Sequence, residues 1–186
     1  ELRKDNRVWF GKEGKNVPRL KRFLSDVKEG VTPMTIWQHE EVGHNQEAFQ
    51  ECRKLFGGKQ YFDTPKPTRL LKKMINIGSD ENDIILDFFA GSSSTSHAIF
   101  SLNEVKKTNR KFICIQLPEE IEESSEAYKA GYKNIAEISK ERIRRVIKKI
   151  ENEQDAEAKE KAGKLDFGDK KEMPKLDLGF KVFKLQ

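Results

Sequence analysis

Residues 83–100 read DIILDFFAGSSSTSHAIF, and this stretch decides the fold of the chain. Ile84 to Phe89 is a short, nearly unbroken apolar run, which predicts a strand buried on both faces of a parallel sheet. Gly91 and the serines after it predict a tight turn, and a helix capped by Ser94 or Thr95 follows. A strand, a glycine turn and a helix N-terminus are together typical of folds that hold a nucleotide-like cofactor at the carboxyl end of a parallel sheet.

The carboxylate of Asp87 narrows the choice of cofactor. Dinucleotide-binding enzymes place a pyrophosphate at this helix N-terminus, and their fingerprint has three glycines. This turn has one glycine, Gly91, and a carboxylate that would repel a phosphate. The pattern therefore favours a cofactor with an ammonium group and no phosphate, such as S-adenosylmethionine. An ordinary strand, turn and helix without a ligand is the structural alternative.

Residues 87–95, DFFAGSSST, resemble the cofactor-binding motif of amino-group DNA methyltransferases, usually Asp-x-Phe-x-Gly-Ser-Gly-Thr-Thr. The resemblance is in particular to the modification subunits of type III restriction systems, which make N6-methyladenine. Ser93 stands where the second glycine is usual. Because this cofactor brings no pyrophosphate to the turn, we expect Ser93 to have a negative φ, with residues 92–95 forming the first turn of the helix.

Two further segments extend the resemblance and imply a Rossmann-like α/β sheet with flanking helices. Residues 64–67, TPKP, resemble the segment that touches the methionine end of the cofactor, although Pro67 would equally suit the first turn of a plain core helix. Residues 111–116, KFICIQ, predict the second parallel strand of a β-α-β unit. At its end Gln116 or Glu119 could accept from the ribose hydroxyls, and we favour Gln116 by register. The expected cofactor contacts are Lys66, Pro67, Asp87, Phe88, Phe89, Ala90, Gly91, Ser92, Thr95, Gln116 and Glu119.

The composition suits one well-packed domain of 186 residues with a net charge of +5, which is compatible with nucleic acid. A basic cluster near Pro18 is either a phosphate-contacting patch or a solvated surface loop. Its members are Lys15, Arg19, Lys21 and Arg22. No apolar run approaches the length of a membrane span, so we expect no membrane partner and a cytoplasmic location. The spacing of His39 and His44 matches no usual ligand set, and no metal is expected.

The chain divides into four expected parts. Residues 1–33 are the tail of a target-recognition or connecting region, and residues 34–153 are the S-adenosylmethionine-binding part. Residues 154–175 are an exposed charged segment, and residues 176–186 are a C-terminal strand. A long helix from about Asn134 carries a buried apolar stripe. Basic residues occupy its other faces, as a solvated surface or as a DNA contact. They are Arg142, Arg144, Arg145, Lys148 and Lys149.

One element that the resemblance implies is missing from the sequence. Adenine-N6 methylation needs a base swung out of the duplex, and this family builds the base pocket from Asp-Pro-Pro-Tyr or a close relative. No two of the six prolines are adjacent. In the permuted subclass that includes type III enzymes, this motif precedes the cofactor motif. We therefore expect the carboxyl-terminal, cofactor-binding part of a DNA methyltransferase, inactive by itself.

The resemblance implies double-stranded DNA as a partner, with a restriction subunit and a second copy of the chain as further possible partners. Two other functions remain open. A module that binds a cofactor or nucleic acid without catalysis is the main alternative. A nicotinamide-dependent oxidoreductase is disfavoured by the single glycine of the turn and by Asp87.

Overall fold

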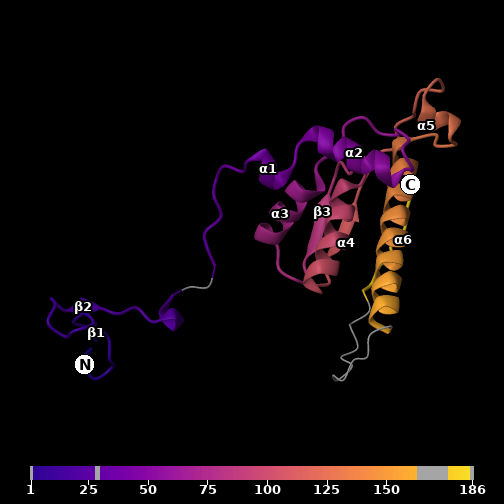
Figure 1. The fold of residues 1–186 in the computed structure, drawn as a ribbon. Coiled ribbons are helices and arrows are strands. Elements are labelled where there is room, and N and C mark those ends of the chain that lie inside the picture. Colours follow the sequence, from indigo (N-terminus) through magenta and orange to yellow (C-terminus); the bar gives the residue numbers. More distant parts are fainter. Residues whose placement is uncertain (1, 28–29, 163–175, 185–186) are drawn as a thin grey trace. The chain divides into compact units, whose positions relative to one another are not determined.

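A computed structural model describes residues 2–27, 30–162 and 176–184 (Figure 1). The chain divides into two compact units, residues 1–35 and 36–186, and each is described by itself. Among the described residues, none of the helices combines the length and the apolar character that a membrane crossing would need.

The first unit is built on a small hairpin. Strands β1 (Val8–Trp9) and β2 (Arg19–Leu20) pair antiparallel, with Val8 opposite Leu20. A single 3-10 turn, η1 (Leu24–Asp26), follows. Arg7 fastens this turn to the hairpin, because its Nη1 donates to Asp26 Oδ2 at 2.5 Å and its guanidinium lies 5.1 Å from the Phe23 ring centroid. This ion pair and this cation–π contact therefore hold the turn against the hairpin.

The second unit is centred on a parallel pair of strands. Strands β3 (Ile84–Asp87) and β4 (Lys111–Cys114) pair in parallel, from Ile84 opposite Lys111 to Asp87 opposite Cys114. Helix α4 (Ser94–Lys106) connects them. The expected β-α-β unit is therefore confirmed. Within the described part of the chain this parallel sheet has two strands, so the α/β arrangement is established and a wider sheet is not.

The described residues cover only one face of this sheet. Ile85 and Phe112 pack against helices α3 (Thr68–Gly78) and α4, in a core that includes Ile75 and Ile99. On the other face, Ile84, Leu86 and Ile113 are 62%, 47% and 51% exposed. The prediction of a strand buried on both faces is therefore wrong for this chain. The apolar run predicted burial because the residues on both faces of the strand are hydrophobic. Helices α3 and α4, however, both pack on the face that carries Ile85.

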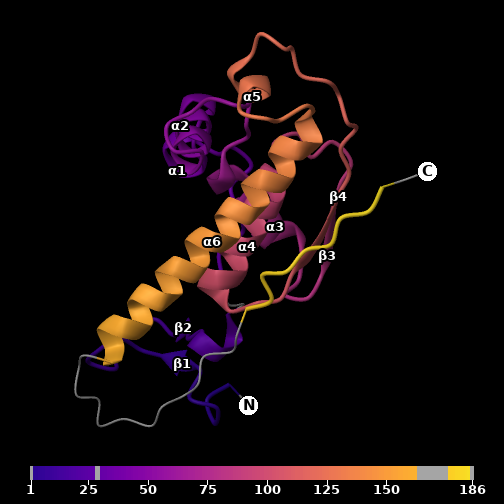
Figure 2. The ribbon, with the colours of Figure 1, turned by 90° about the vertical axis from the view of Figure 1, so that its right-hand side faces the viewer.

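The long helix α6 (Ile135–Ala162) packs along α4 (Figure 2). Phe100 of α4 lies in one core cluster with Val146 and Ile150 of α6, and Leu178 and Phe180 from the last described segment pack against it. No strand is present over residues 176–184, so the expected C-terminal strand is wrong there, and residues 185–186 lie outside the described residues. The expected charged segment begins inside α6, and residues 163–175 of it also lie outside.

Three shorter helices complete the second unit: α1 (His39–Val42), α2 (Asn45–Leu55) and α5 (Glu126–Lys129). An aromatic cluster joins α2 and α5 to the start of α6. Phe56 makes edge contacts with Tyr61 and Tyr132, at centroid distances of 5.3 Å and 6.4 Å. The Arg145 guanidinium lies 5.0 Å from the centre of the Phe56 ring. Phe62 packs against the same cluster and leads into the segment before α3.

Candidate functional site

Asp87 ends β3 with its carboxylate turned back over the turn that follows. Its Oδ1 accepts from the backbone N–H of Phe89 at 3.1 Å, and its Oδ2 accepts from Thr95 Oγ1 at 2.5 Å. Cys114 lies opposite in the register, and burial together with the charge of Asp87 raises the pKa of the Cys114 thiol to about 12. The thiol beside Asp87 is therefore neutral.

The backbone N–H groups of the turn are bonded within the protein. The N–H of Ala90 donates to Ile115 O at 3.1 Å, that of Gly91 to Gln116 Oε1 at 2.7 Å, and that of Ser93 to Ala90 O at 2.7 Å. A pyrophosphate site needs such N–H groups to point at the ligand. Here these three, and that of Phe89, point at protein oxygens instead. These four N–H groups are therefore not directed at a ligand.

Ser93 differs from our expectation. Its φ is +58° and its ψ is +41°, in the left-handed region, and α4 begins only at Ser94. The predicted negative φ is wrong, and so is the predicted cap, because α4 has no side-chain cap. The hydroxyl of Thr95 donates to Asp87 instead, and that of Ser94 accepts from α6. The sequence argument considered only the cofactor side of the turn, whereas Ser93 is 1% exposed and faces the protein.

Gln116 and Glu119 follow β4 in different roles. The Gln116 amide spans the gap to the turn, since its Oε1 accepts from Gly91 and its Nε2 donates to Leu117 O at 3.1 Å. Glu119 is exposed, and its backbone oxygen accepts from the N–H of Ile135 at 3.0 Å. Of the two candidates for the ribose contact, only Gln116 is hydrogen-bonded to the glycine turn.

The segment before α3 reaches the turn through Phe62. A Cβ added to Gly91 would lie 3.2 Å from Phe62 Cζ, so Phe62 lies directly against the turn. Pro67 is buried and precedes the first residue of α3, while Lys66 is exposed. The predicted Pro-started helix is confirmed. A contact of Lys66 and Pro67 with a cofactor stays a prediction.

The other members of the turn divide by exposure. Phe88 and Phe89 are 61% and 88% exposed, whereas Ala90 and Ser92 are buried. Side-chain hydrogen bonds join several predicted residues across the turn: Asp87 accepts from Phe89 and Thr95, and Gln116 accepts from Gly91. Two exposed aromatic rings lie beside them in the sequence.

The sequence analysis missed a buried polar network beneath the turn. Arg142 of α6, expected on a solvated or DNA-binding face, is completely buried. Its Nη1 donates to Ser92 Oγ and to Ser94 Oγ, both at 2.8 Å, and its Nη2 lies 3.2 Å from His97 Nδ1. The spacing held the signal, because Arg142 lies four residues after Ile138 and four before Val146, on the apolar stripe. The charge of Arg142 predicted an exposed side chain, whereas its position on the apolar stripe of the helix predicted a buried one.

The network extends to the start of α3. Glu51 of α2 lies 3.8 Å from Arg142 Nη2, and its Oε1 accepts from Thr68 Oγ1 at 2.6 Å. Burial lowers the pKa of His97 well below its usual value, and the nearby charges of Arg142, Lys72 and Lys149 lower it further. The His97 imidazole is therefore neutral at pH 7, and its Nδ1 accepts from Arg142.

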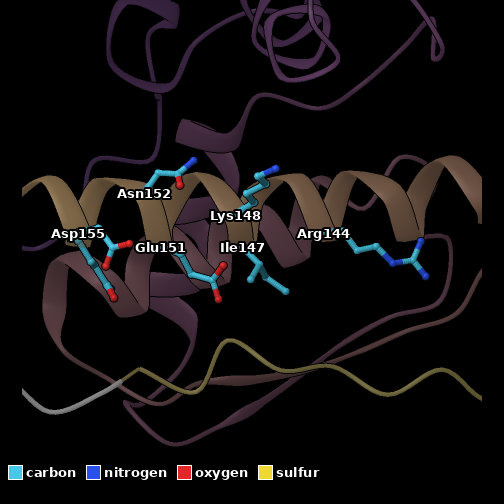
Figure 3. Close-up of a pocket in the computed structure, with 7 residues that line it drawn as sticks. Arg144, Ile147, Lys148, Glu151, Asn152 and Asp155 are labelled. Atoms are coloured by element: carbon cyan, nitrogen blue, oxygen red, sulfur yellow. The ribbon is translucent and has the colours of Figure 1, made fainter.

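The basic residues expected near DNA are arranged differently on the two units. On α6, Arg144 and Arg145 both pair with Glu141. Further along α6, Figure 3 shows a shallow pocket with cationic and anionic side chains side by side. Its labelled charged residues are Arg144, Lys148, Glu151 and Asp155. This mixture favours a solvated helix face over a DNA contact.

In the first unit, Lys21 Nζ donates to Asn6 Oδ1 at 2.9 Å, and Lys15, Arg19 and Arg22 are exposed. Residues 1–35 contain nine basic and five acidic side chains, so they carry +4 of the net charge of +5. Among the described residues, no group of three or more His, Cys, Asp or Glu side chains is placed to hold a metal ion.

Comparison with known proteins covers most of the chain. Residues 3–129 match the N6/N4 methyltransferase family model described as DNA methylase. The chain is 42% identical over 146 residues to the type III restriction-modification enzyme StyLTI Mod subunit of Salmonella typhimurium, which is 78% of this chain and 22% of that protein. It is 38% identical over 148 residues to the EcoPI Mod subunit of Escherichia phage P1, covering 80% and 23%. It is 34% identical over 138 residues to the type II methyltransferase M.KpnI of Klebsiella pneumoniae, covering 74% and 32%. The chain therefore spans about a fifth to a third of the length of these relatives.

Proposed function

The chain belongs to the DNA methylase family, and on that basis we propose that it is the S-adenosylmethionine-binding part of a DNA adenine-N6 methyltransferase of a restriction-modification system. The relatives named as Mod subunits support the adenine-N6 and type III assignment. The wider Rossmann-like sheet expected of such an enzyme is part of the same proposal.

One observation carries the proposal: four N–H groups of the glycine turn donate to protein oxygens, and a carboxylate lies at the strand end. Phe89, Ala90, Gly91 and Ser93 all donate within the chain. These four N–H groups are not available to a phosphate, and the Asp87 carboxylate would repel one. An ammonium group suits this strand end, because the Asp87 carboxylate has lone pairs beyond those that Phe89 and Thr95 use.

Each predicted contact except Glu119 has a chemical role in this proposal. S-adenosylmethionine supplies a methyl group on a sulfonium centre. Asp87 holds the ammonium of the methionine part, and Lys66 with Pro67 borders the same part. Gln116 accepts from a ribose hydroxyl at the end of β4. The turn residues Phe88 to Ser92 and Thr95 line the remaining wall.

A binding comparison tests this role. Isothermal titration of the chain with S-adenosylmethionine should give saturable binding, whereas NADH should give none. Saturable NADH binding at the same site would overturn the proposal in favour of an oxidoreductase. Asp83→Asn, an exposed carboxylate before β3, is a matched control for Asp87→Asn, because both remove one negative charge.

Catalysis requires a base pocket that these residues do not contain, since no two prolines are adjacent. We propose that the pocket lies elsewhere in the enzyme, so the isolated chain binds cofactor without transferring its methyl group. Incubation with tritiated S-adenosylmethionine and unmethylated duplex DNA should leave no more label on the DNA than a heat-killed control. Incorporation above that level would mean that a described segment supplies the pocket.

The basic first unit is our candidate for DNA contact. Lys15, Arg19, Lys21 and Arg22 would neutralise phosphates, and such contacts make affinity fall with rising salt. The logarithm of the DNA affinity should fall linearly with the logarithm of salt concentration, and removing one contact should lower the slope by about one. Arg144→Gln, on the mixed-charge face of α6, should leave the slope unchanged. By analogy with the Mod subunits, a restriction subunit and a second copy of the chain are proposed as further partners.

A further inference from the structure

Arg142 is buried for a reason that apolar packing does not supply. A charged guanidinium removed from water is costly unless hydrogen bonds compensate it. Arg142 is 0% exposed, and its Nη1 bonds to two hydroxyls of the glycine turn. Its Nε is buried without a hydrogen-bond partner among the described residues. The guanidinium is therefore positioned for the turn, even at the expense of one unsatisfied N–H.

The two hydroxyls that Arg142 holds belong to the neighbours of a strained residue. Ser92 and Ser94 flank Ser93, whose φ of +58° is unfavourable for any residue with a side chain. The backbone around Ser93 is bonded as well: its N–H donates to Ala90 O, and its carbonyl accepts from Ser96 Oγ at 2.9 Å. Arg142 thus holds the residues on both sides of Ser93 by hydrogen bonds. A glycine at position 93 would adopt the same left-handed conformation without such support.

We propose that Arg142 is a positioning residue, which holds Ser93 in the left-handed conformation and so keeps the turn in its cofactor-binding shape. The motif that this turn resembles usually has glycine at this position, and glycine can adopt the left-handed conformation at no steric cost. Here serine occupies this position, and the hydrogen bonds from Arg142 of α6 to Ser92 and Ser94 stabilise the left-handed conformation that serine disfavours. Through Glu51 and Thr68, the same guanidinium is tied to the residue that follows Pro67. The inference rests on the proposed function for what the turn binds, and on the geometry for what Arg142 holds.

The alternative role for Arg142 is to fill space between α4 and α6. The two roles differ in whether the effect of changing Arg142 depends on Ser93. Arg142→Lys keeps the positive charge near Glu51 but has one terminal nitrogen in place of two, so it cannot bond the two serine hydroxyls and His97 in the fixed geometry of the guanidinium. If Arg142 holds the turn, a glycine at position 93 makes its hydrogen bonds unnecessary for the left-handed conformation, so changing Arg142 should then have little effect on cofactor affinity. If Arg142 only packs, the identity of residue 93 makes no difference.

A double-mutant cycle on the 186-residue chain tests this, with S-adenosylmethionine affinity from isothermal titration as the readout. Arg142→Lys alone should weaken binding about tenfold, because the cofactor must then restore a left-handed serine. Ser93→Gly alone should leave affinity within about threefold of wild type, and the double variant should recover to that level. Equal losses in the single Arg142→Lys and double variants would overturn the proposal. Arg145→Lys, also on α6 but bonded to Glu141, is the control and should show no dependence on Ser93.

Hydrogen exchange without cofactor provides a second readout. The Ser93 amide, bonded to Ala90 O, should lose protection in Arg142→Lys, whereas the Leu102 amide within α4 should keep it. In the Ser93→Gly background, Arg142→Lys should leave the amide at position 93 protected. If the wild-type chain does not bind S-adenosylmethionine but this exchange pattern appears, the proposed function fails and the role of Arg142 stands. Uniform loss of protection along α4 would overturn that role.

Should Arg142→Lys not fold, Ser92→Ala and Ser94→Ala remove the acceptors one at a time. Each should lower affinity in the Ser93 background and not in the Ser93→Gly background. Affinity losses that are equal in the two backgrounds would overturn the proposal.

Discussion

The Asp87 carboxylate and the Thr95 hydroxyl meet at 2.5 Å across the glycine turn. The bond links residues eight positions apart in the sequence and joins the end of β3 to the first turn of α4. It also fixes the direction of the carboxylate, so the charge at the strand end is oriented before any ligand arrives. A cofactor with an ammonium group then meets a preformed partner and does not have to order one.

Asp87→Asn should weaken S-adenosylmethionine binding by about ten- to a hundredfold, because a charge-assisted hydrogen bond is worth roughly 1.5–3 kcal/mol. Isothermal titration measures the change, and circular dichroism checks the fold. Asp83→Asn is the matched control and should keep wild-type affinity. Unchanged affinity in a folded Asp87→Asn variant would show that the carboxylate does not contact the cofactor.

Gln116→Ala should lower the affinity roughly three- to tenfold, since one neutral hydrogen bond contributes about 0.5–1.5 kcal/mol. The variant also leaves the Gly91 N–H without its acceptor, which loosens the turn. Glu119→Ala should have no effect on binding, because only the backbone oxygen of Glu119 is engaged. The opposite ranking of the two variants would assign the ribose to Glu119.

His97 should make the chain less stable in mild acid. The pKa of His97 is lowered in the folded state. Below about pH 6.5 the imidazole is therefore protonated in the unfolded chain and still neutral in the folded chain. The stability due to the neutral imidazole is complete above that pH and is lost as the pH falls. The free energy of unfolding should decrease by up to about 1.4 kcal/mol per pH unit. Urea unfolding between pH 7.5 and 5 measures the slope.

His97→Asn keeps an acceptor for Arg142 and removes the titrating group, so it should flatten this dependence. His39→Asn is the control, because the His39 side chain is 65% exposed. An equal slope in wild type and His97→Asn would mean that other groups cause the acid sensitivity.

Gly91→Ala should destabilise the chain by about 1–2 kcal/mol, because residue 91 has a φ of +52° that disfavours a side chain. The added methyl group would also press on the Phe62 ring. Gly78→Ala provides the comparison, since its Cβ would meet nothing within 4 Å at the end of α3. There alanine should be neutral or stabilising by up to about 1 kcal/mol. Thermal unfolding of the two variants compares them, and equal midpoints would contradict the strain at Gly91.

The parts of the fold that local pattern determines were predictable from the sequence. The apolar run at Ile84, the glycine at 91 and the strand at Phe112 predict the β-α-β unit, and Pro67 predicts the start of α3. The parts that depend on distant contacts were not. Ser93 lies in the left-handed region beside hydroxyls that a guanidinium 48 and 50 residues away holds. The charge of Arg142 favoured the surface, while its place on the apolar stripe was the better guide.

The exposed face of the β3–β4 sheet should make copies of the chain attract one another in solution. This face of β3 and β4 presents a contiguous apolar surface to water, made by Ile84, Leu86 and Ile113. Water gains entropy when such surfaces meet, and this attraction weakens on cooling. Static light scattering of the chain should therefore show a second virial coefficient that becomes more negative on warming. Replacing Leu86 and Ile113 with threonine should move it toward repulsion, while β3 and β4 keep their parallel pairing.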